Sequence, residues 1–351
     1  MSLLLKVHYM SRISPILTIA MACILTLGCR KDTHVDNGDV LAFEATRITT
    51  KGFGDNLIDN TDLDTDGSAF GIYGCYAPSA GGTNSTNVFD GENAVKVTYY
   101  ASDSEWSYYK DDESKKKYWK RNEHYRFRAF YPYDAAVLES ASSVDEIIIN
   151  YKIEEHDSDL LVAFATRCPA QDPEGFSRVK LTFKHALAAL DFKVIFAENV
   201  PSGLKDEITE FWMVGLHPAE NLTYSHAGDR LTPTLLWSAS YFDDKNSYYQ
   251  WTGNKEFGRK GDPGVEAVSI FDGDGLAFVI PQECSSSKGK TRIYFRTKDG
   301  GSTLHSAELE NIIWEPGKIY TYTLHVNRSN INVTVSIKDW EVLQSNVDIY
   351  L

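Results

Sequence analysis

The stretch Arg178–Phe196, RVKLTFKHALAALDFKVIF, changes the parity of its apolar residues halfway along. In its first half Val179, Leu181 and Phe183 stand at odd positions. After the alanines, the apolar residues stand at even positions: Leu190, Phe192, Val194 and Phe196. Side chains alternate between the two faces of a strand, so a change of parity indicates a bulge or a crossing between sheets. The Val, Phe and Thr content argues against the alternative, a short helix around 185–190. We predict a long strand that breaks near the alanines, where a second domain begins.

Length and composition favour a strand-rich protein of more than one domain. The chain has 351 residues, which suits two domains of about 150 residues each. It contains 20 Tyr, 17 Phe and 7 Trp and no long helical heptad pattern, as is typical of β proteins. The formal net charge of −14 repels nucleic acid phosphates. We therefore expect no nucleic acid partner.

The first 28 residues have the pattern of a signal peptide. Arg12 precedes an apolar run at 13–27, which is short for a membrane span and typical of a signal h-region. We therefore exclude residues 1–28 from the folded protein and expect export.

The end of this segment resembles a bacterial lipobox, in which a cysteine becomes the lipidated N-terminus. The sequence LTLGC ends at Cys29 and is followed at once by polar residues, although Thr26 stands where leucine is preferred. Two alternatives remain open: lipidation of Cys23, and an ordinary cleaved signal without lipid. Lipidation at Cys29 predicts a palmitate-bearing lipoprotein anchored to the cell outer membrane.

Behind the lipid site, a polar tether at 29–39 leads into a sequence of short strands. Leu41, Phe43 and Ala45 alternate with more polar residues, which predicts a first, half-buried strand. The clearest pattern comes near the end, where apolar residues alternate at 320–326 and again at 331–337. We predict an antiparallel hairpin there, with one face in water.

Several motifs, in this order and spacing, resemble the fimbrillin family, the Mfa-like lipoprotein subunits of type V pili in Bacteroidales. The motifs are the lipobox at Cys29, FGIYGCY at 70–76, YW…YRFRAFYP at 118–132, DLLVAF at 159–164, VKLTFKHALAALDFKV at 179–194 and WEPGKIYTYTL…INVTVSIKDW at 314–340. They extend over nearly the whole chain behind the signal segment.

The resemblance implies an all-β fold of two tandem transthyretin-like antiparallel β-sandwich domains, at 40–176 and 177–351. It also implies a structural or adhesive fimbrial (pilus) subunit that is exported as a lipoprotein and assembled by strand exchange. Its partners would be other pilin subunits, the outer membrane, and surface glycans or proteins of a host or another bacterium. Neither an enzymatic activity nor a cofactor is implied.

In this family a protease commonly cuts after a basic residue beyond the first strand, and Arg47 is the matching residue. The released strand would contain Leu41, Phe43 and Ala45. The alternative is that Arg47 is an ordinary loop arginine and the strand stays in place.

Alternating apolar residues at the C-terminus suggest a donor strand for a neighbouring subunit: Val347, Ile349 and Leu351. The alternative is a last edge strand that folds onto its own domain.

Signals for catalysis or metal binding are weak. The run Asp62–Gly67 begins like a calcium loop, but Tyr73 occupies the position where a bidentate glutamate is required. No nucleophile elbow, zinc-protease motif or phosphate-binding loop occurs, so we assign no catalytic residue, no metal ligand and no cofactor.

The alternative function is a non-polymerising surface lipoprotein that binds carbohydrate through exposed aromatic rings. The candidate rings are Trp106, Tyr108, Tyr109, Tyr248, Tyr249 and Trp251.

Overall fold

A computed structural model gives the fold. It describes residues 38–47, 63–82, 85–91, 94–133, 146–152, 159–198, 207–225, 234–238, 242–271, 276–286, 289–298, 303–309, 312–326 and 331–339. The predicted signal peptide and lipid site therefore lie outside the described residues. So does the predicted donor tail.

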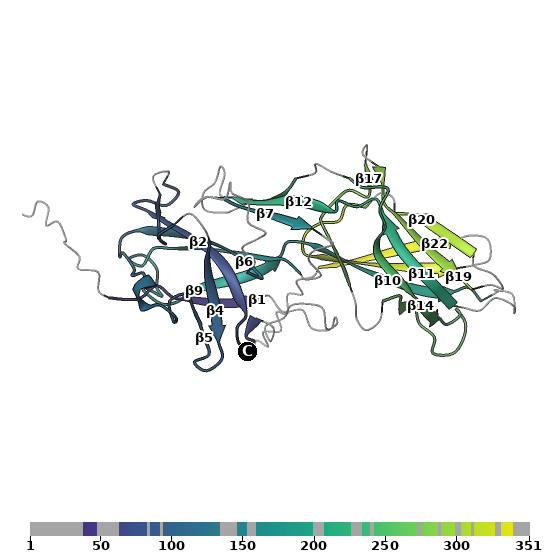
Figure 1. The fold of residues 1–351 in the computed structure, drawn as a ribbon, viewed down its shortest axis with the longest axis horizontal. Coiled ribbons are helices and arrows are strands. Elements are labelled where there is room, and N and C mark those ends of the chain that lie inside the picture. Colours follow the sequence, from purple (N-terminus) through teal and green to yellow (C-terminus); the bar gives the residue numbers. More distant parts are fainter. Residues whose placement is uncertain are drawn as a thin grey trace, which may run out of the picture. The chain divides into compact units, whose positions relative to one another are not determined.

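The first part of the chain forms an eight-stranded sheet in the order β3-β2-β4-β5-β1-β9-β8-β6, in which β2 also pairs with β6 (Figure 1). Its strands are β1 (Phe43–Arg47), β2 (Ala69–Ala77), β3 (Thr86–Asn87), β4 (Val95–Tyr100), β5 (Glu105–Ser107), β6 (His124–Tyr131), β8 (Leu161–Arg167) and β9 (Val179–His185). A short 3-10 helix, η1, occupies Glu113–Lys115. The β2–β6 pairing closes the sheet on itself, and β1 lies between β5 and β9.

Glycine in β2 has a packing role. Gly71 pairs with Phe130 of β6, and a Cβ placed on Gly71 would lie 2.2 Å from the Phe130 ring. Glycine inside a strand marks such close approaches, because any side chain would displace the neighbouring ring. The FGIYGCY motif therefore belongs to the closure of this sheet.

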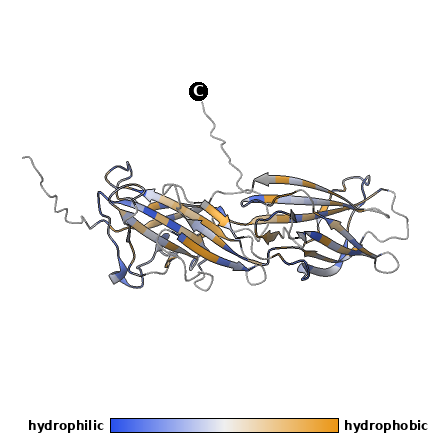
Figure 2. Cartoon of the chain, turned by 90° about the horizontal axis from the view of Figure 1, so that it is seen from above, coloured by the Kyte–Doolittle hydropathy of each residue, from blue (hydrophilic) through white to orange (hydrophobic). Residues whose placement is uncertain are grey.

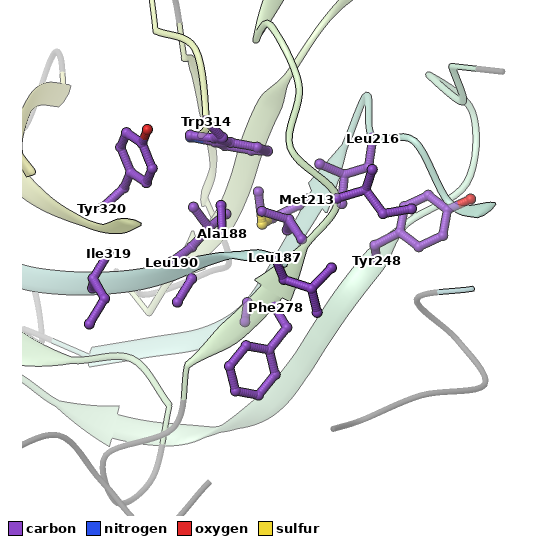
Figure 3. Packing of buried hydrophobic residues seen from close by; sticks show 14 of the residues in the cluster. Leu187, Ala188, Leu190, Met213, Leu216, Tyr248, Phe278, Trp314, Ile319 and Tyr320 are labelled. Carbon is purple, nitrogen blue, oxygen red and sulfur yellow. The ribbon is translucent and has the colours of Figure 1, made fainter. Parts of the chain in front are cut away.

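The predicted break near the alanines is confirmed as a crossing between two sheets. β9 ends at His185, and β10 (Ala188–Phe196) begins in a different, five-stranded sheet. Ala186 and Leu187, between the two strands, are fully buried. Figure 3 shows Leu187, Ala188 and Leu190 among Met213, Phe278 and Trp314 of the second core. The parity changes because the chain leaves one core and enters the next.

Two further sheets build the second core. The five-stranded sheet contains β10, β15 (Val268–Ser269), β16 (Ala277–Val279), β21 (Lys318–Val326) and β22 (Ile331–Asp339). The four-stranded sheet has the order β14 (Tyr248–Glu256), β11 (Glu207–Val214), β19 (Arg292–Thr297) and β20 (Thr303–Glu308). Their inner faces share one hydrophobic cluster, and Figure 2 shows apolar and polar segments alternating along the strands. The predicted hairpin is confirmed, because β21 and β22 pair antiparallel in full register.

A smaller sheet joins distant parts of the chain in the order β13 (Thr234–Trp237), β12 (Ala219–Ser225) and β7 (Glu146–Lys152). The remaining pair is β17 (Ser285–Ser286) and β18 (Gly289–Lys290). Ile147, Ile149 and Tyr151 of β7 are buried in the second core. β7 therefore packs with strands that follow it by more than sixty residues.

One region differs from the sequence-based expectation. The polar and aromatic stretch 238–266 shows no alternation that would predict a strand, yet β14 lies within it. Residues 249–256 of β14 alternate between half-buried and exposed, and only Tyr248 is fully buried. Such a polar edge strand carries too little apolar alternation to be recognised from sequence.

The fold class is all-β, as predicted. The predicted domain limit at residue 176 precedes β9, whereas β9 hydrogen-bonds to β1 and β8 of the first sheet. The change of sheet falls between His185 and Ala188. We propose this point as the limit of the first domain.

Candidate assembly site around the first strand

β1 lies between β5 and β9 and is held mainly by β9. It pairs parallel with β9 over five residues, from Phe43 opposite Val179 to Arg47 opposite Phe183. Its antiparallel pairing with β5 is limited to Phe43 opposite Trp106. The backbone N–H of Val179 also donates to the carbonyl oxygen of Ala42 at 2.8 Å. One strand therefore provides most of the hydrogen bonds that retain β1.

The inner face of β1 is part of the first core. Leu41 and Phe43 are fully buried and Ala45 is 7% exposed. The Phe43 ring lies 5.4–6.4 Å, centroid to centroid, from four other rings: Phe70, Phe89, Tyr108 and Phe127. Most of these contacts are edge-to-face, the arrangement that aromatic quadrupoles favour. β1 is therefore the strand predicted at Leu41–Ala45, and its apolar face is buried in the first core.

The opposite face of β1 meets water. Glu44 and Thr46 are exposed and Ala42 is half-buried. The strand therefore has one apolar and one polar face, and its apolar face alone fixes its register.

A tyrosine hydroxyl forms hydrogen bonds that hold the segment leading into β1. The Tyr108 hydroxyl donates to the carbonyl oxygen of Leu41 at 3.1 Å and accepts from the backbone N–H of Lys117, also at 3.1 Å. The backbone N–H of Leu41 donates to the Lys117 carbonyl oxygen at 2.8 Å. Burial raises the pKa of Tyr108, and the hydrogen bond from Lys117 opposes this. Nothing in the sequence indicated this role, because Tyr108 looked like an ordinary strand aromatic.

Arg47 is the last residue of β1, and the described chain stops there before resuming at residue 63. A cut between Arg47 and Ile48 would leave the whole of β1 on the N-terminal fragment. β1 would then be joined to the rest of the protein by noncovalent contacts alone.

The other predicted assembly residues lie outside the described residues. These are the lipidation site Cys29 and the donor residues Val347, Ile349 and Leu351. The structure therefore brings together Leu41, Phe43, Ala45 and the backbone of Arg47, and the remaining assignments stay predictions.

An apolar edge strand precedes the predicted donor tail. On β22, Val335 is 37% and Ile337 54% exposed, whereas their cross-strand partners Tyr322 and Tyr320 are each 1% exposed. Directly opposite residues of an antiparallel pair point to the same face of a sheet. On the inner face of this sheet, the side chains of β21 are thus buried, whereas those of Val335 and Ile337 on β22 are exposed to solvent.

Three of the six aromatic residues considered for carbohydrate stacking are buried in the cores, and Tyr109, Tyr249 and Trp251 are half-buried. Tyr248, Trp106 and Tyr108 are 4%, 5% and 8% exposed, respectively. A ring buried to this extent presents no face to a sugar, so these three residues supply no stacking platform.

The described part of the chain meets neither the requirements of a metal site nor those of a membrane-spanning helix. No group of three or more His, Cys, Asp or Glu side chains there could hold a metal ion. In the run that begins like a calcium loop, an Asp66 carboxylate oxygen accepts from the backbone N–H of Ala101 at 2.9 Å. None of the helices among these residues is long and apolar enough to cross a membrane.

Solved structures with a similar fold include a fimbrial protein and putative cell adhesion proteins. A fimbrial protein from Bacteroides vulgatus has a TM-score of 0.55 at 15% identity, with 86% of this chain and 99% of that chain covered. A putative cell adhesion protein from Bacteroides ovatus has a TM-score of 0.53 at 12% identity, with 86% and 96% covered. Another, from Bacteroides uniformis, has a TM-score of 0.51 at 16% identity, with 86% and 99% covered. At these identities the likeness concerns the fold alone.

Sequence comparison identifies the family. No curated protein matches the chain at a significant level. A family model described as fimbrillin-like matches residues 46–340, which is most of the sequence. This match confirms the resemblance seen in the motifs, and the chain belongs to the fimbrillin-like family.

Proposed function

We propose that the protein is a structural or adhesive subunit of a cell-surface fimbria, exported as a lipoprotein and assembled by strand exchange. Membership of the fimbrillin-like family supports a fimbrial role. The observation that carries the assembly step is the position of β1: it is a core strand, it is held mainly by β9, and it ends at Arg47.

Strand exchange follows from the physics of this position. Loss of β1 would expose the apolar area now covered by Leu41, Phe43 and Ala45, at about 25 cal/mol per Å². It would also leave unpaired backbone groups on β9, each with a penalty of about 1–3 kcal/mol if they stay buried. An incoming strand with alternating apolar residues would cover the exposed apolar area and pair with the free backbone groups of β9. Addition of a strand in this way is called β-augmentation. We propose Val347, Ile349 and Leu351 of a neighbouring subunit as that strand.

Proteolysis at Arg47 would make the exchange possible in practice. While the chain is intact, β1 competes for its own groove at the high effective concentration of an intramolecular strand. After the cut β1 can dissociate, and the neighbour's strand then competes on equal terms. A subunit that escapes the cut would keep its lipid and serve as an anchor.

The proposed location follows from the N-terminal segment. Lipidation at Cys29 would hold the uncut subunit at the outer membrane, and the assembled fimbria would lie on the cell surface. Other pilin subunits are the proposed partners.

The test is treatment of the wild type and an Arg47→Ala variant with an arginine-specific protease, which does not cut after Lys51, followed by size-exclusion chromatography. The wild type should be cut between Arg47 and Ile48 and form oligomers, and the variant should remain monomeric. Wild-type protein that is cut at this bond and still stays monomeric would exclude strand exchange through this groove.

A further inference from the structure

A pair of aromatic rings lies on the outer face of the four-stranded sheet. Trp212 of β11 and Tyr294 of β19 stand directly opposite each other, with ring centroids 5.4 Å apart and ring planes that differ by 8°. Both side chains are half-buried. Because side chains alternate between the faces of a sheet, the pair lies on the side away from the second core. Its neighbours along the two strands are at most 1% exposed: Phe211, Met213, Ile293 and Phe295.

The edge strand β20 leaves space beside this pair. β19 lies between β11 and β20, so Tyr294 has Trp212 on one side and a residue of β20 on the other. The residue of β20 directly opposite Tyr294 is Ser306, which is exposed. A hydroxymethyl group leaves room beside the ring that a larger side chain would fill. One side of the Tyr294 ring is therefore bordered by a small polar group.

Charged residues frame the aromatic pair, and they are matched with opposite charges. Two residues before and after Tyr294 on β19, Arg292 and Arg296 share its face of the sheet. Arg296 donates from Nε to Glu210 at 2.9 Å, and Arg292 donates from Nε and Nη2 to one oxygen of Glu308 at 3.0 and 2.8 Å. An anionic ligand would have to compete with these two carboxylates for the guanidinium groups. This face therefore suits a ligand without charge.

The chemistry of the face matches that of a neutral sugar. A pyranose ring presents C–H groups on one side, and their partial positive charge suits the negative face of an aromatic ring. Its hydroxyls can donate to the carboxylates of Glu210 and Glu308 and exchange hydrogen bonds with the Ser306 hydroxyl. The side chains of the two ion pairs are 33–43% exposed, so these groups are within reach of a ligand in solution.

A protein partner fits this face less well. A stable protein interface covers about 800 Å² on each partner and has an apolar centre. Here the apolar side chains available are the two rings and Leu304, which is 47% exposed on β20. They lie between two ion pairs, and on β14 the residue opposite Glu210 is the exposed, polar Thr252. So small an apolar area suits a sugar ring better than a second protein surface.

We propose that this face binds an uncharged glycan chain, with one sugar ring against Tyr294 above Ser306 and its hydroxyls toward Glu210 and Glu308. The proposal goes beyond the fimbrial role, because it assigns the subunit a ligand class. It does not depend on strand exchange, since none of these residues lies on β1 or in the core around it.

The direct test is calorimetric titration of the full chain with four neutral hexasaccharides and one acidic one. The neutral probes are cellohexaose, maltohexaose, laminarihexaose and mannohexaose, and the acidic probe is hexagalacturonate. At least one neutral probe should bind with a Kd below about 1 mM and about tenfold or more tightly than hexagalacturonate. Equal binding of hexagalacturonate would overturn the uncharged class, and absence of binding by all four neutral probes would overturn the site.

Ser306→Leu tests the location without removal of a ring. The larger side chain should fill the space beside Tyr294 and weaken binding of the neutral glycan about tenfold. The matched control is Ser336→Leu, the same change at an exposed position of another edge strand, β22, in the other sheet of this sandwich. It should leave the affinity unchanged. Equal weakening by the two substitutions would mean that the ligand binds elsewhere.

Two substitutions of Tyr294 separate the ring from its hydroxyl. Tyr294→Phe keeps the ring and should bind within about twofold of the wild type, whereas Tyr294→Ala should weaken binding about tenfold or more. Tyr118→Ala removes a ring that is 44% exposed elsewhere in the chain and should have no effect. Thermal unfolding identifies the variants that fold. A folded Tyr294→Ala protein with wild-type affinity would overturn the proposal.

Discussion

The hydroxyl of Tyr108 donates to the carbonyl oxygen of Leu41 at 3.1 Å, and this bond fastens the start of the first strand to the core. The same hydroxyl accepts from the backbone N–H of Lys117, so it joins two segments that are distant in sequence. Both Tyr108 and Leu41 are buried. The position of β1 thus depends on the hydrogen bonds of Leu41 inside an apolar environment as well as on the pairing of β1 with β9.

Tyr108→Phe should lower the free energy of unfolding by about 1–2 kcal/mol, because the buried Leu41 carbonyl loses its hydroxyl partner while the ring still packs on Phe43. Denaturant titration measures the change. The control is Tyr109→Phe, the same substitution at the half-buried neighbouring ring, which should stay within about 0.5 kcal/mol of the wild type. Equal effects of the two substitutions would contradict the role given to the Tyr108 hydroxyl.

Phe43→Ala should destabilise the protein by about 3–5 kcal/mol, because it opens a cavity among four rings in the first core. The adjacent Glu44→Ala changes the exposed face of the same strand and should have little effect. Thermal unfolding of the two variants, measured side by side, compares how much the buried and the exposed face of β1 contribute to stability. A loss of less than about 1 kcal/mol at Phe43 would mean that β1 contributes little to this core.

Stability should decrease at alkaline pH. Burial raises the pKa of Tyr322, which also accepts from Nε1 of Trp314 at 2.8 Å, and burial raises the pKa of Tyr224. These tyrosines keep their protons in the folded protein, whereas they ionise near pH 10 in the unfolded chain. Their contribution is therefore complete below about pH 10 and is lost as the pH rises further.

Unfolding free energies measured between about pH 8 and pH 11 test this pH dependence. Tyr322→Phe should show a shallower alkaline decline than the wild type, since one of the responsible groups is gone. Tyr118→Phe, at a position 44% exposed, is the control and should decline as the wild type does. Parallel curves for all three proteins would rule out a contribution from Tyr322.

A cut in the loop between β8 and β9 should leave the protein in one piece. A specific protease site placed at 173–176 would separate β9 from β8 in the covalent chain, yet β9 pairs with β1 over five residues. Denaturing electrophoresis should show two fragments, and size-exclusion chromatography should show one species. Elution of two separate folded halves would instead support a domain limit at residue 176.

Cys29→Ser should abolish incorporation of labelled palmitate and release the protein from the membrane fraction. Cys23→Ser is the matched control, because it removes the other cysteine of the signal segment and should leave labelling intact. Labelling that persists in Cys29→Ser and disappears in Cys23→Ser would assign the lipid to Cys23.

Local alternation of apolar residues was enough to predict many of the longer strands and the all-β class. The period of two in 320–326 and 331–337 predicted the β21–β22 hairpin. The parity change at the alanines predicted a break, by a bulge or a crossing, and the structure shows the crossing from β9 to β10. Both patterns are visible in the sequence because a strand that is buried on one face must alternate apolar with polar residues, whichever strands it pairs with. β14 was missed because polar residues interrupt its apolar alternation, although Tyr248, Tyr249 and Trp251 pack in or against the second core.

The tertiary structure alone decided which strands are neighbours and which side chains come together. The parallel pairing of β1 with β9 joins residues 43–47 to 179–183, and no local pattern encodes a partner so far along the chain. The same holds for Trp212 and Tyr294, which stand on adjacent strands and stack their rings. Sequence periodicity reports which face of a strand is buried, whereas the partner is selected by the packing of the whole core.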